Sequence, residues 1–169
     1  MIAPGDLSDP RIAELLRVHL SHARAHCPPC STHALDLSGL RAPEVSFWAA
    51  WQDEVLAGVG ALLDLGPDHG EVKSMHTAEH MRGRGVGAAM LLHVAEDAKR
   101  RGYSRLSLET GSMDYFAPAR ALYRRHGFFE CESFGSYVPD SNSIFMSLDL
   151  GFVPQPRSTA RGSYSASTK

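Results

Sequence analysis

The chain has 169 residues, of which 43% are hydrophobic, so it is long enough to bury a single core. Its formal net charge of -2 gives no overall positive field, and no run of lysine and arginine gives a local one, which argues against nucleic-acid binding. No apolar run approaches the about 20 residues of a membrane-spanning helix. The N-terminus does not resemble a signal peptide, and three cysteines favour a reducing compartment. We therefore expect a cytoplasmic monomer or homodimer that binds neither nucleic acid nor membrane.

The first predicted element is a helix. Ser8 or Asp9 can cap its N-terminus, and Pro10 suits its first position. Apolar residues then recur at helical spacing up to Pro28-Pro29, where the helix should end.

The segment after this helix has some features of a zinc site. Cys27 and Cys30 form a C-x-x-C pair. Three histidines lie close to it in the sequence: His22, His26 and His33. A second pair at the spacing of a zinc finger is missing from the sequence, and Cys131 is distant along the chain. We therefore expect no metal, and we interpret the C-x-x-C segment as a loop.

Two strands are predicted next, at Glu44–Trp51 and Val55–Leu63. Only a short polar turn separates them, so they should form a hairpin. Gly58 and Gly60 interrupt the second strand, where they indicate a bulge or the close approach of another backbone.

The stretch from residue 70 to 102 predicts a strand, a glycine-rich turn and a helix. The strand is Glu71–Ala78, and the helix runs from about Val86 to Arg101, with Gly102 placed to end it. Such a turn can hold an anion, because free backbone N–H groups converge at the start of the helix and its dipole favours negative charge. The glycines follow G-x-G-x-G, which matches neither a dinucleotide fingerprint nor a P-loop.

The remaining elements complete one domain over residues 1–150. We expect a strand at Ser104–Thr110, a short helix that Pro118 opens and Gly127 ends, and strands at Phe128–Ser133 and Ser143–Leu150. This order predicts an α/β fold, with helices on both faces of a mixed sheet. Residues 151–169 are rich in Ser, Gly, Pro and Thr, which is typical of a disordered tail.

Two motifs resemble those of the GNAT superfamily of N-acyltransferases. Arg82, Gly85 and Gly87 match its acyl-CoA pyrophosphate loop, which reads Gln or Arg, two residues, Gly, one residue, Gly or Ala. Downstream, the segment from Ala121 to Phe128 (ALYRRHGF) resembles the family's A-x-x-L-Y-x-x-x-G-F signature. The two motifs stand in the family's order. The resemblance implies a single mixed, mostly antiparallel sheet of about six or seven strands.

The same resemblance implies where acetyl-CoA binds as a co-substrate. In the family the fourth strand parts from the fifth, and the pantetheine arm of CoA lies between them like an added strand. This places the cofactor against Met75, His76 and Thr77, whose strand amides are suited to polarise the thioester carbonyl. The pyrophosphate is expected on the loop and the start of the helix, at Arg82, Gly83, Arg84, Gly85, Val86, Gly87 and Ala88.

Tyr123 matches the position of the family's tyrosine acid, which protonates the departing thiolate. Its other interpretation is a core aromatic, because it sits on the apolar face of its helix. An incoming amine is mostly protonated at neutral pH, so a proton acceptor is also needed. Glu71 stands where some family members carry a catalytic glutamate, although Lys73 on the same strand face can pair with it. Glu109 is the second candidate, His76 the third, and an ordered water remains open.

The implied function is an N-acetyltransferase that moves an acetyl group from acetyl-CoA to a primary amine of a small molecule or amino acid, by direct attack in a ternary complex. The alternative is a non-catalytic acyl-CoA-binding or partner-binding module of the same fold. The acceptor is expected opposite CoA, near a set of acidic, hydroxyl and aromatic residues: His33, Asp36, Trp48, Glu109, Ser112, Asp114 and Tyr137.

Overall fold

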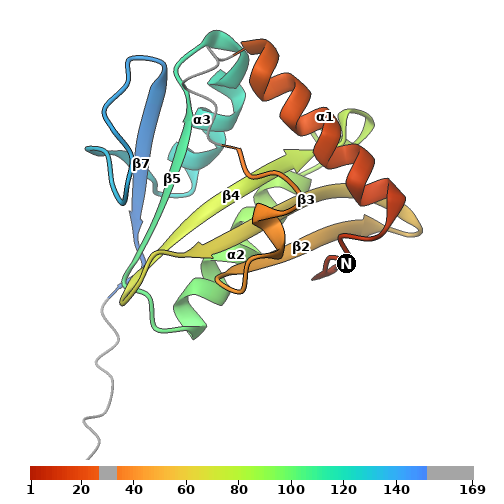
Figure 1. The fold of residues 1–169 in the computed structure, drawn as a ribbon, viewed down its shortest axis with the longest axis horizontal. Helices are drawn as coiled ribbons and strands as arrows, with labels where there is room; N and C mark the ends of the chain where they lie inside the picture. Colours follow the sequence, from red (N-terminus) through yellow and green to blue (C-terminus); the bar gives the residue numbers. More distant parts are fainter. Residues whose placement is uncertain (27–33, 152–169) are drawn as a thin grey trace, which may run out of the picture.

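One sheet of seven strands organises the part of the chain that the computed structural model describes, residues 1–26 and 34–151 (Figure 1). The strands are β1 (Ile2–Pro4), β2 (Val45–Gln52), β3 (Val55–Asp64), β4 (His69–Thr77), β5 (Arg105–Gly111), β6 (Phe129–Glu130) and β7 (Ser143–Asp149). Their order in the sheet is β1-β2-β3-β4-β5-β7-β6. Only β4 and β5 pair in parallel, and the other neighbours are antiparallel. The mixed, mostly antiparallel sheet is therefore confirmed.

Three α-helices cover the two faces of the sheet: α1 (Pro10–His26), α2 (Val86–Arg100) and α3 (Ala117–Arg125). Figure 1 shows α1 in front of the sheet and α2 behind it. Within residues 1–26 and 34–151, short 3-10 helices lie in the connections at η2 (Gly39–Arg41), η3 (Glu79–Met81) and η4 (Asp114–Phe116). Of these helices, none is long and apolar enough to cross a membrane.

Each face of the sheet has its own apolar core. On the α1 face, Ile12 and Leu16 pack against residues of β2 and β3, including Val59 and Ala61. On the other face, α2 buries five residues that recur at helical spacing in its sequence: Met90, Leu91, Val94, Ala95 and Ala98. Tyr123 and Phe128 belong to this second core, so α3 lies on the same face as α2.

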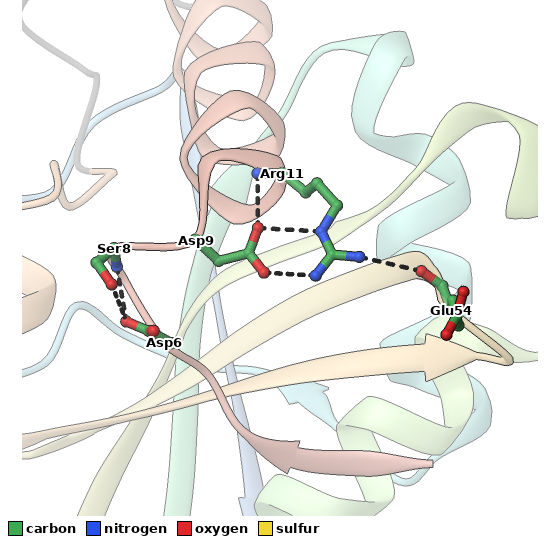
Figure 2. Close-up of polar contacts among 5 residues, drawn as sticks. All are labelled: Asp6, Ser8, Asp9, Arg11 and Glu54. Carbon is green, nitrogen blue, oxygen red and sulfur yellow. Dashed lines mark hydrogen bonds and ion pairs between the residues drawn. The ribbon is translucent and has the colours of Figure 1, made fainter.

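The start of α1 is fixed to the β2–β3 hairpin by Arg11 (Figure 2). Asp9 caps the helix, because its Oδ1 accepts the backbone N–H of Arg11 at 2.8 Å. The Arg11 guanidinium donates to both Asp9 oxygens and to the Glu54 carbonyl, and it lies 4.4 Å from the centre of the Trp51 ring. These hydrogen bonds lower the pKa of Asp9 to about 2. Ser8, the other predicted cap, instead donates to Asp6.

Gly58 marks the predicted close approach of another backbone, and Gly60 lies at the predicted bulge and packs closely on a side chain. An added Cβ on Gly60 would lie 2.7 Å from Cγ of Met90, and one on Gly58 would lie 2.9 Å from the His76 carbonyl. The register between β3 and β4 also shifts here, so Gly60 faces two residues of β4, Ser74 and Met75.

Two edge strands differ from expectation. β1 was not expected from the sequence, because three residues ending in proline carry no strand signal. β6 has only Phe129 and Glu130, where a strand at 128–133 is predicted, and the chain from 131 to 142 is a loop. The predicted tail, from residue 152 onward, lies outside the described residues.

Candidate active site

Strands β4 and β5 are paired only at their beginnings. His69, Gly70 and Glu71 are in register with Arg105, Leu106 and Ser107. Beyond these three pairs the two strands do not pair with each other, although β4 extends to Thr77 and β5 to Gly111. We call the parts of the two strands that do not pair with each other, 72–77 and 108–111, the fork; 72–77 still pairs with β3 and 108–111 with β7. Because alternate residues of a strand direct their amides to opposite sides, half of the β4 amides in the fork face the place that β5 has left. Such an edge can pair with an extended ligand.

A bulge in β4 lies within the fork. Ser74 has a φ of 51°, which is unusual for a residue other than glycine and is often found at functional sites. After the bulge, Met75 contacts the α2 side of the sheet near Gly60 and Met90, while His76 faces α1. The three predicted cofactor residues of β4 therefore point to both sides of the strand. The sequence carries no signal for this bulge, because serine does not mark a left-handed position.

The glycine loop that follows β4 has the geometry expected of an anion site. Gly83 and Gly85 have φ values of 73° and 81°, and Gly85 is the N-cap of α2 without any side-chain cap. The amides of the first turn, from Val86 onward, therefore lack intrahelical acceptors. The Arg82 amide donates to the Glu79 carbonyl at 3.2 Å, so Arg82 has only its exposed side chain to offer to an anion.

Gly87 brings three elements together at this loop. An added Cβ there would lie 3.3 Å from Cδ2 of Leu122 in α3 and 3.4 Å from Oγ1 of Thr77 in β4. The second motif, which contains Leu122 and Tyr123, therefore lies beside the first one.

Tyr123 is buried in the α2-side core, with its ring 5.9 Å from that of Phe128. Burial and the negative charge of Glu109 raise the pKa of Tyr123 to about 12, so its phenol is protonated at neutral pH. Its two neighbouring arginines have other partners. Arg120 donates to the carbonyls of Gly111 and Met113, and Arg124 pairs with Glu130.

Glu71 is held in a buried network on the α1 face. Its Oε1 accepts from Nζ of Lys73 at 3.1 Å and from the hydroxyl of Tyr137 at 2.5 Å. Lys73 also donates to the Tyr137 hydroxyl at 2.6 Å. The expected pairing of Glu71 with Lys73 is thus confirmed, and only 2% of Glu71 is exposed. We call Glu71, Lys73 and Tyr137 the buried triad.

The polar character of this face continues onto β5 and β7. Ser143 donates to Oε1 of Glu109 at 2.7 Å, and Glu109 is half-buried. Closer to the paired end, Ser107 is hydrogen-bonded to His69 at 2.8 Å and to Ser147.

Five rings meet at the open end of the fork, on the α1 face: His19, His22, His26, His76 and Tyr115. We call them the ring cluster. The His76 ring lies 5.3 Å from that of His19 and 5.9 Å from that of His22. The Tyr115 hydroxyl is 2.7 Å from Nδ1 of His22, and the Tyr115 ring stacks on His26 at 3.8 Å. Burial is the main cause that lowers the pKa of His19 to about 4 and that of His76 to about 3.

The chain is similar to known proteins over most of its length. Residues 12–128 match the model of the acetyltransferase (GNAT) family. The chain belongs to this family. It is 50% identical over 146 residues to the uncharacterized N-acetyltransferase YsnE of Bacillus subtilis strain 168, covering 86% of this chain and 96% of that protein. It is 45% identical over 149 residues to the uncharacterized N-acetyltransferase YedL of Escherichia coli K12, covering 88% and 94%.

A solved structure supports the same assignment for this GNAT acetyltransferase. A protein of Klebsiella pneumoniae, assigned as an acyl-CoA N-acyltransferase, superposes with a TM-score of 0.75 at 28% identity. The match covers 89% of this chain and 97% of that protein. The expected fold and the enzyme class are therefore confirmed, whereas the roles of single residues remain predictions.

Some of the residues expected around the acceptor of this GNAT acetyltransferase lie elsewhere. The prediction for Trp48 is wrong, because its ring packs on His93 of α2 at 5.1 Å, on the face opposite α1. Asp36 accepts hydrogen bonds from Ser38 and Gly39 within its own turn. His33 lies outside the described residues. Of that set, the structure brings Glu109 and Tyr137 to the polar face beside the fork.

The zinc alternative can be tested only in part. Within residues 1–26 and 34–151, no three His, Cys, Asp or Glu side chains are arranged to hold a metal ion. Cys27, Cys30 and His33 lie outside the described residues, so the expectation that this segment binds no metal stays a prediction.

Proposed function

We propose that this GNAT acetyltransferase transfers an acetyl group from acetyl-CoA to the primary amine of a small molecule or amino acid, by direct attack within a ternary complex. The observation that carries the proposal is the fork, which opens directly toward an uncapped helix N-terminus. An extended ligand with an anionic group at one end fits this combination.

In the proposed complex the pantetheine arm pairs with β4 along Met75, His76 and Thr77. The pyrophosphate contacts the amides of residues 83–88, while the exposed side chains of Arg82 and Arg84 neutralise its charge. The backbone N–H groups exposed by the fork polarise the thioester carbonyl.

The chemical step forms one bond and breaks one. The amine nitrogen attacks the thioester carbon, the resulting oxyanion collapses, and the carbon–sulfur bond breaks to release the CoA thiolate. Tyr123 donates a proton to that sulfur. With a pKa of about 12, Tyr123 is protonated at neutral pH, as an acid must be before it donates, although the raised value makes it a weaker acid than an exposed tyrosine.

The amine must lose a proton before or during attack, and two carboxylates are candidates for its acceptor. Glu71 is buried and already accepts from Lys73 and Tyr137. Glu109 is half-buried and lies on the fork strand β5, so we place it first and Glu71 second. Proton transfer through an ordered water is compatible with either choice.

The first experiment is a thermal-shift titration with acetyl-CoA, CoA and NADH. A ligand that binds only the folded protein adds about 2.7 kcal/mol of stability at 100 times its Kd. We expect a shift with acetyl-CoA and CoA but not with NADH. No shift with acetyl-CoA would refute the assignment of the fork and loop.

The second experiment measures thiol release with a panel of primary amines. Tyr123→Phe should lower kcat by about 10²- to 10⁴-fold while the acetyl-CoA thermal shift is retained. Glu109→Gln should lower kcat and Glu71→Gln should lower it less, and Phe129→Leu, on the exposed edge strand, is the matched control. CoA binding without transfer to any amine would instead indicate the non-catalytic module.

A further inference from the structure

A hollow of about 380 Å³ lies at the base of the fork, where β4 and β5 are still paired. This volume is within the range of about 300–1,000 Å³ that is typical of ligand pockets. The β3–β4 turn, the start of β5 and the end of β7 meet there, at the lower left of Figure 1. We call it the base hollow, and its polar lining consists of Asp68, His69, Ser104, Arg105 and Asp149. None of its described lining residues belongs to the fork or to the glycine loop, so it is separate from the proposed site of acetyl transfer.

Backbone hydrogen bonds fix the walls of the base hollow. The Asp68 carbonyl accepts the amides of Ser104 and Arg105, each at 3.0 Å, which joins the β3–β4 turn to β5. The Leu150 amide donates to the Ser104 carbonyl at 2.8 Å, which joins the end of β7 to the same point. The charged side chains therefore extend from a fixed frame, and a ligand would not have to order the backbone when it binds.

His69 orients the guanidinium group of Arg105. Nη2 of Arg105 lies 3.1 Å from Nδ1 of His69, and this nitrogen is the acceptor because arginine can only donate. Nε2 of His69 therefore carries the hydrogen and donates to Ser107 at 2.8 Å. Burial and the charge of Arg105 lower the pKa of His69, which favours this neutral form. Among residues 1–26 and 34–151, the Arg105 side chain has no other hydrogen-bond partner, so its remaining N–H groups can bind a carboxylate.

The two carboxylates of the base hollow are not used by the fold. Arg105 and Asp149 are register partners on β5 and β7, so their side chains lie on the same face, but they do not form an ion pair. In the described part of the chain, neither Asp149 nor Asp68 uses its carboxylate in a hydrogen bond or an ion pair. One guanidinium against two carboxylates gives the base hollow a net charge of −1.

This set of charges selects one class of ligand. It does not suit a metal ion, because no three His, Cys, Asp or Glu side chains of the described residues are arranged to hold one. A simple anion would meet two carboxylates, and a simple amine would leave the guanidinium without a partner. A basic α-amino acid carries one carboxylate and two cations, so its charges complement those of the base hollow one for one.

We propose that the base hollow is a second ligand site, and that it binds a free basic α-amino acid such as lysine. The ligand carboxylate pairs with Arg105. The α-ammonium group, next to that carboxylate, pairs with Asp149, which stands opposite Arg105 across the two strands. The side-chain ammonium reaches Asp68 in the β3–β4 turn. The inference does not rest on the proposed function, because none of these residues takes part in acetyl transfer.

The test is isothermal titration calorimetry of the full chain at neutral pH without acetyl-CoA, using L-lysine, L-norleucine and cadaverine. Norleucine is lysine without the side-chain ammonium, and cadaverine is lysine without the carboxylate. A hydrogen bond between charged groups contributes about tenfold or more to affinity. We therefore expect L-lysine to bind about tenfold more tightly than either analogue.

Variants then locate the bound lysine. Asp149 and Arg105 are exposed, so their substitution should not prevent folding. Asp149→Asn should weaken the binding of L-lysine by about tenfold. Arg105→Gln removes the partner of the carboxylate and should bring the affinities for L-lysine and cadaverine close to each other. Glu96→Gln makes the same change of charge as Asp149→Asn at an exposed position of α2, and it should leave L-lysine binding unchanged.

Each other outcome overturns the inference in a different way. Cadaverine binding as tightly as L-lysine would show that the base hollow only attracts cations. Norleucine binding as tightly would remove the role of Asp68. L-Lysine binding that Asp149→Asn leaves unchanged but Glu109→Gln weakens would place the amino acid at the site of acetyl transfer instead. No saturable binding of L-lysine would mean that the base hollow is not a ligand site.

Discussion

The two faces of the β4–β5–β7 region differ in polarity, although the same strands make both. Along β5, Leu106 and Leu108 enter the α2-side core, while Ser107 and Glu109 between them enter the polar face. On β4, Val72 belongs to the apolar core and its neighbours Glu71 and Lys73 to the buried triad.

This difference separates stability from chemistry. Apolar burial contributes about 25 cal/mol per Å², so the α2 face stabilises the domain and holds the loop and Tyr123 in place. On the α1 side, β4, β5 and β7 bury polar groups, which costs free energy unless each has a partner. Such groups add little to stability, unlike the apolar core that α1 forms with β2 and β3.

Of the substitutions that test this difference between the faces, one at Lys73 should cause the largest loss of stability. Lys73→Met leaves the Glu71 carboxylate buried without its ammonium partner, and we expect a loss of about 3–5 kcal/mol in the free energy of unfolding. Urea denaturation measures it. The control Lys99→Met removes an exposed lysine of α2 and should change stability little. The double variant Glu71→Leu/Lys73→Met should recover much of the loss. A change below about 1 kcal/mol in Lys73→Met would show that the triad is not a coupled unit.

A pair of adjacent leucines on α2 tests the apolar face. Leu91 is 1% exposed and Leu92 is 51% exposed. Leu91→Ala should therefore cost about 2–5 kcal/mol through lost burial and a cavity. Leu92→Ala should stay within about 0.5 kcal/mol. The stability change of each variant is measured from the shift of its urea denaturation midpoint, provided that the m-value is the same as in the wild type. Equal costs at the two positions would mean that α2 does not bury the face that we describe.

The two faces also differ in how far the sequence predicts them. The apolar face follows from spacing alone, because Met90, Leu91 and Val94 recur at the helical period. The glycine loop and the Tyr123 motif were also readable, since both are local patterns. The Trp48 error has a physical reason: strand alternation assigns a residue to a face but does not say which helix covers that face.

The polar face depends on contacts between distant segments. Tyr137 meets Glu71 across 66 positions, and Tyr115 meets His22 across 93. No local pattern encodes such pairs. The histidines of α1 were visible, but they were considered only as zinc ligands beside Cys27 and Cys30, an interpretation that the sequence disfavoured, and not as a cluster of rings. The Ser74 bulge, which keeps Lys73 and His76 on one face, has no signal either.

Lowering the pH should reduce the stability that the polar face contributes, because its buried histidines become protonated on unfolding, whereas the residues of the α2-side core do not titrate in this range. The folded-state pKa values of His19 and His76, about 4 and about 3, lie below the value of about 6.5 expected for an unfolded chain. The unfolded chain therefore binds more protons below pH 6.5, so stability is full above that pH and falls as the pH decreases toward 4. We expect a loss of about 1–3 kcal/mol between pH 7 and pH 5.5.

The control for this pH effect replaces the buried histidines. His19→Gln/His76→Gln should flatten the dependence of the urea midpoint on pH, whereas His80→Gln, at an exposed position, should leave it steep. An unchanged slope in the double variant would assign the acid sensitivity to other groups.

The smallest expected effect concerns Tyr137, which ties the loop from 131 to 142 to β4. Tyr137→Phe removes one hydroxyl from the buried triad but leaves Lys73 paired with Glu71, so the cost should be about 1–2 kcal/mol, less than for Lys73→Met. A double-mutant cycle between these two changes should show a coupling of about 0.5–3 kcal/mol, because both act on the same carboxylate oxygen. If the stability losses of Tyr137→Phe and Lys73→Met simply add, Tyr137 stabilises only its own loop. Its hydrogen bond to Glu71 and the Lys73–Glu71 ion pair would then be two independent contacts.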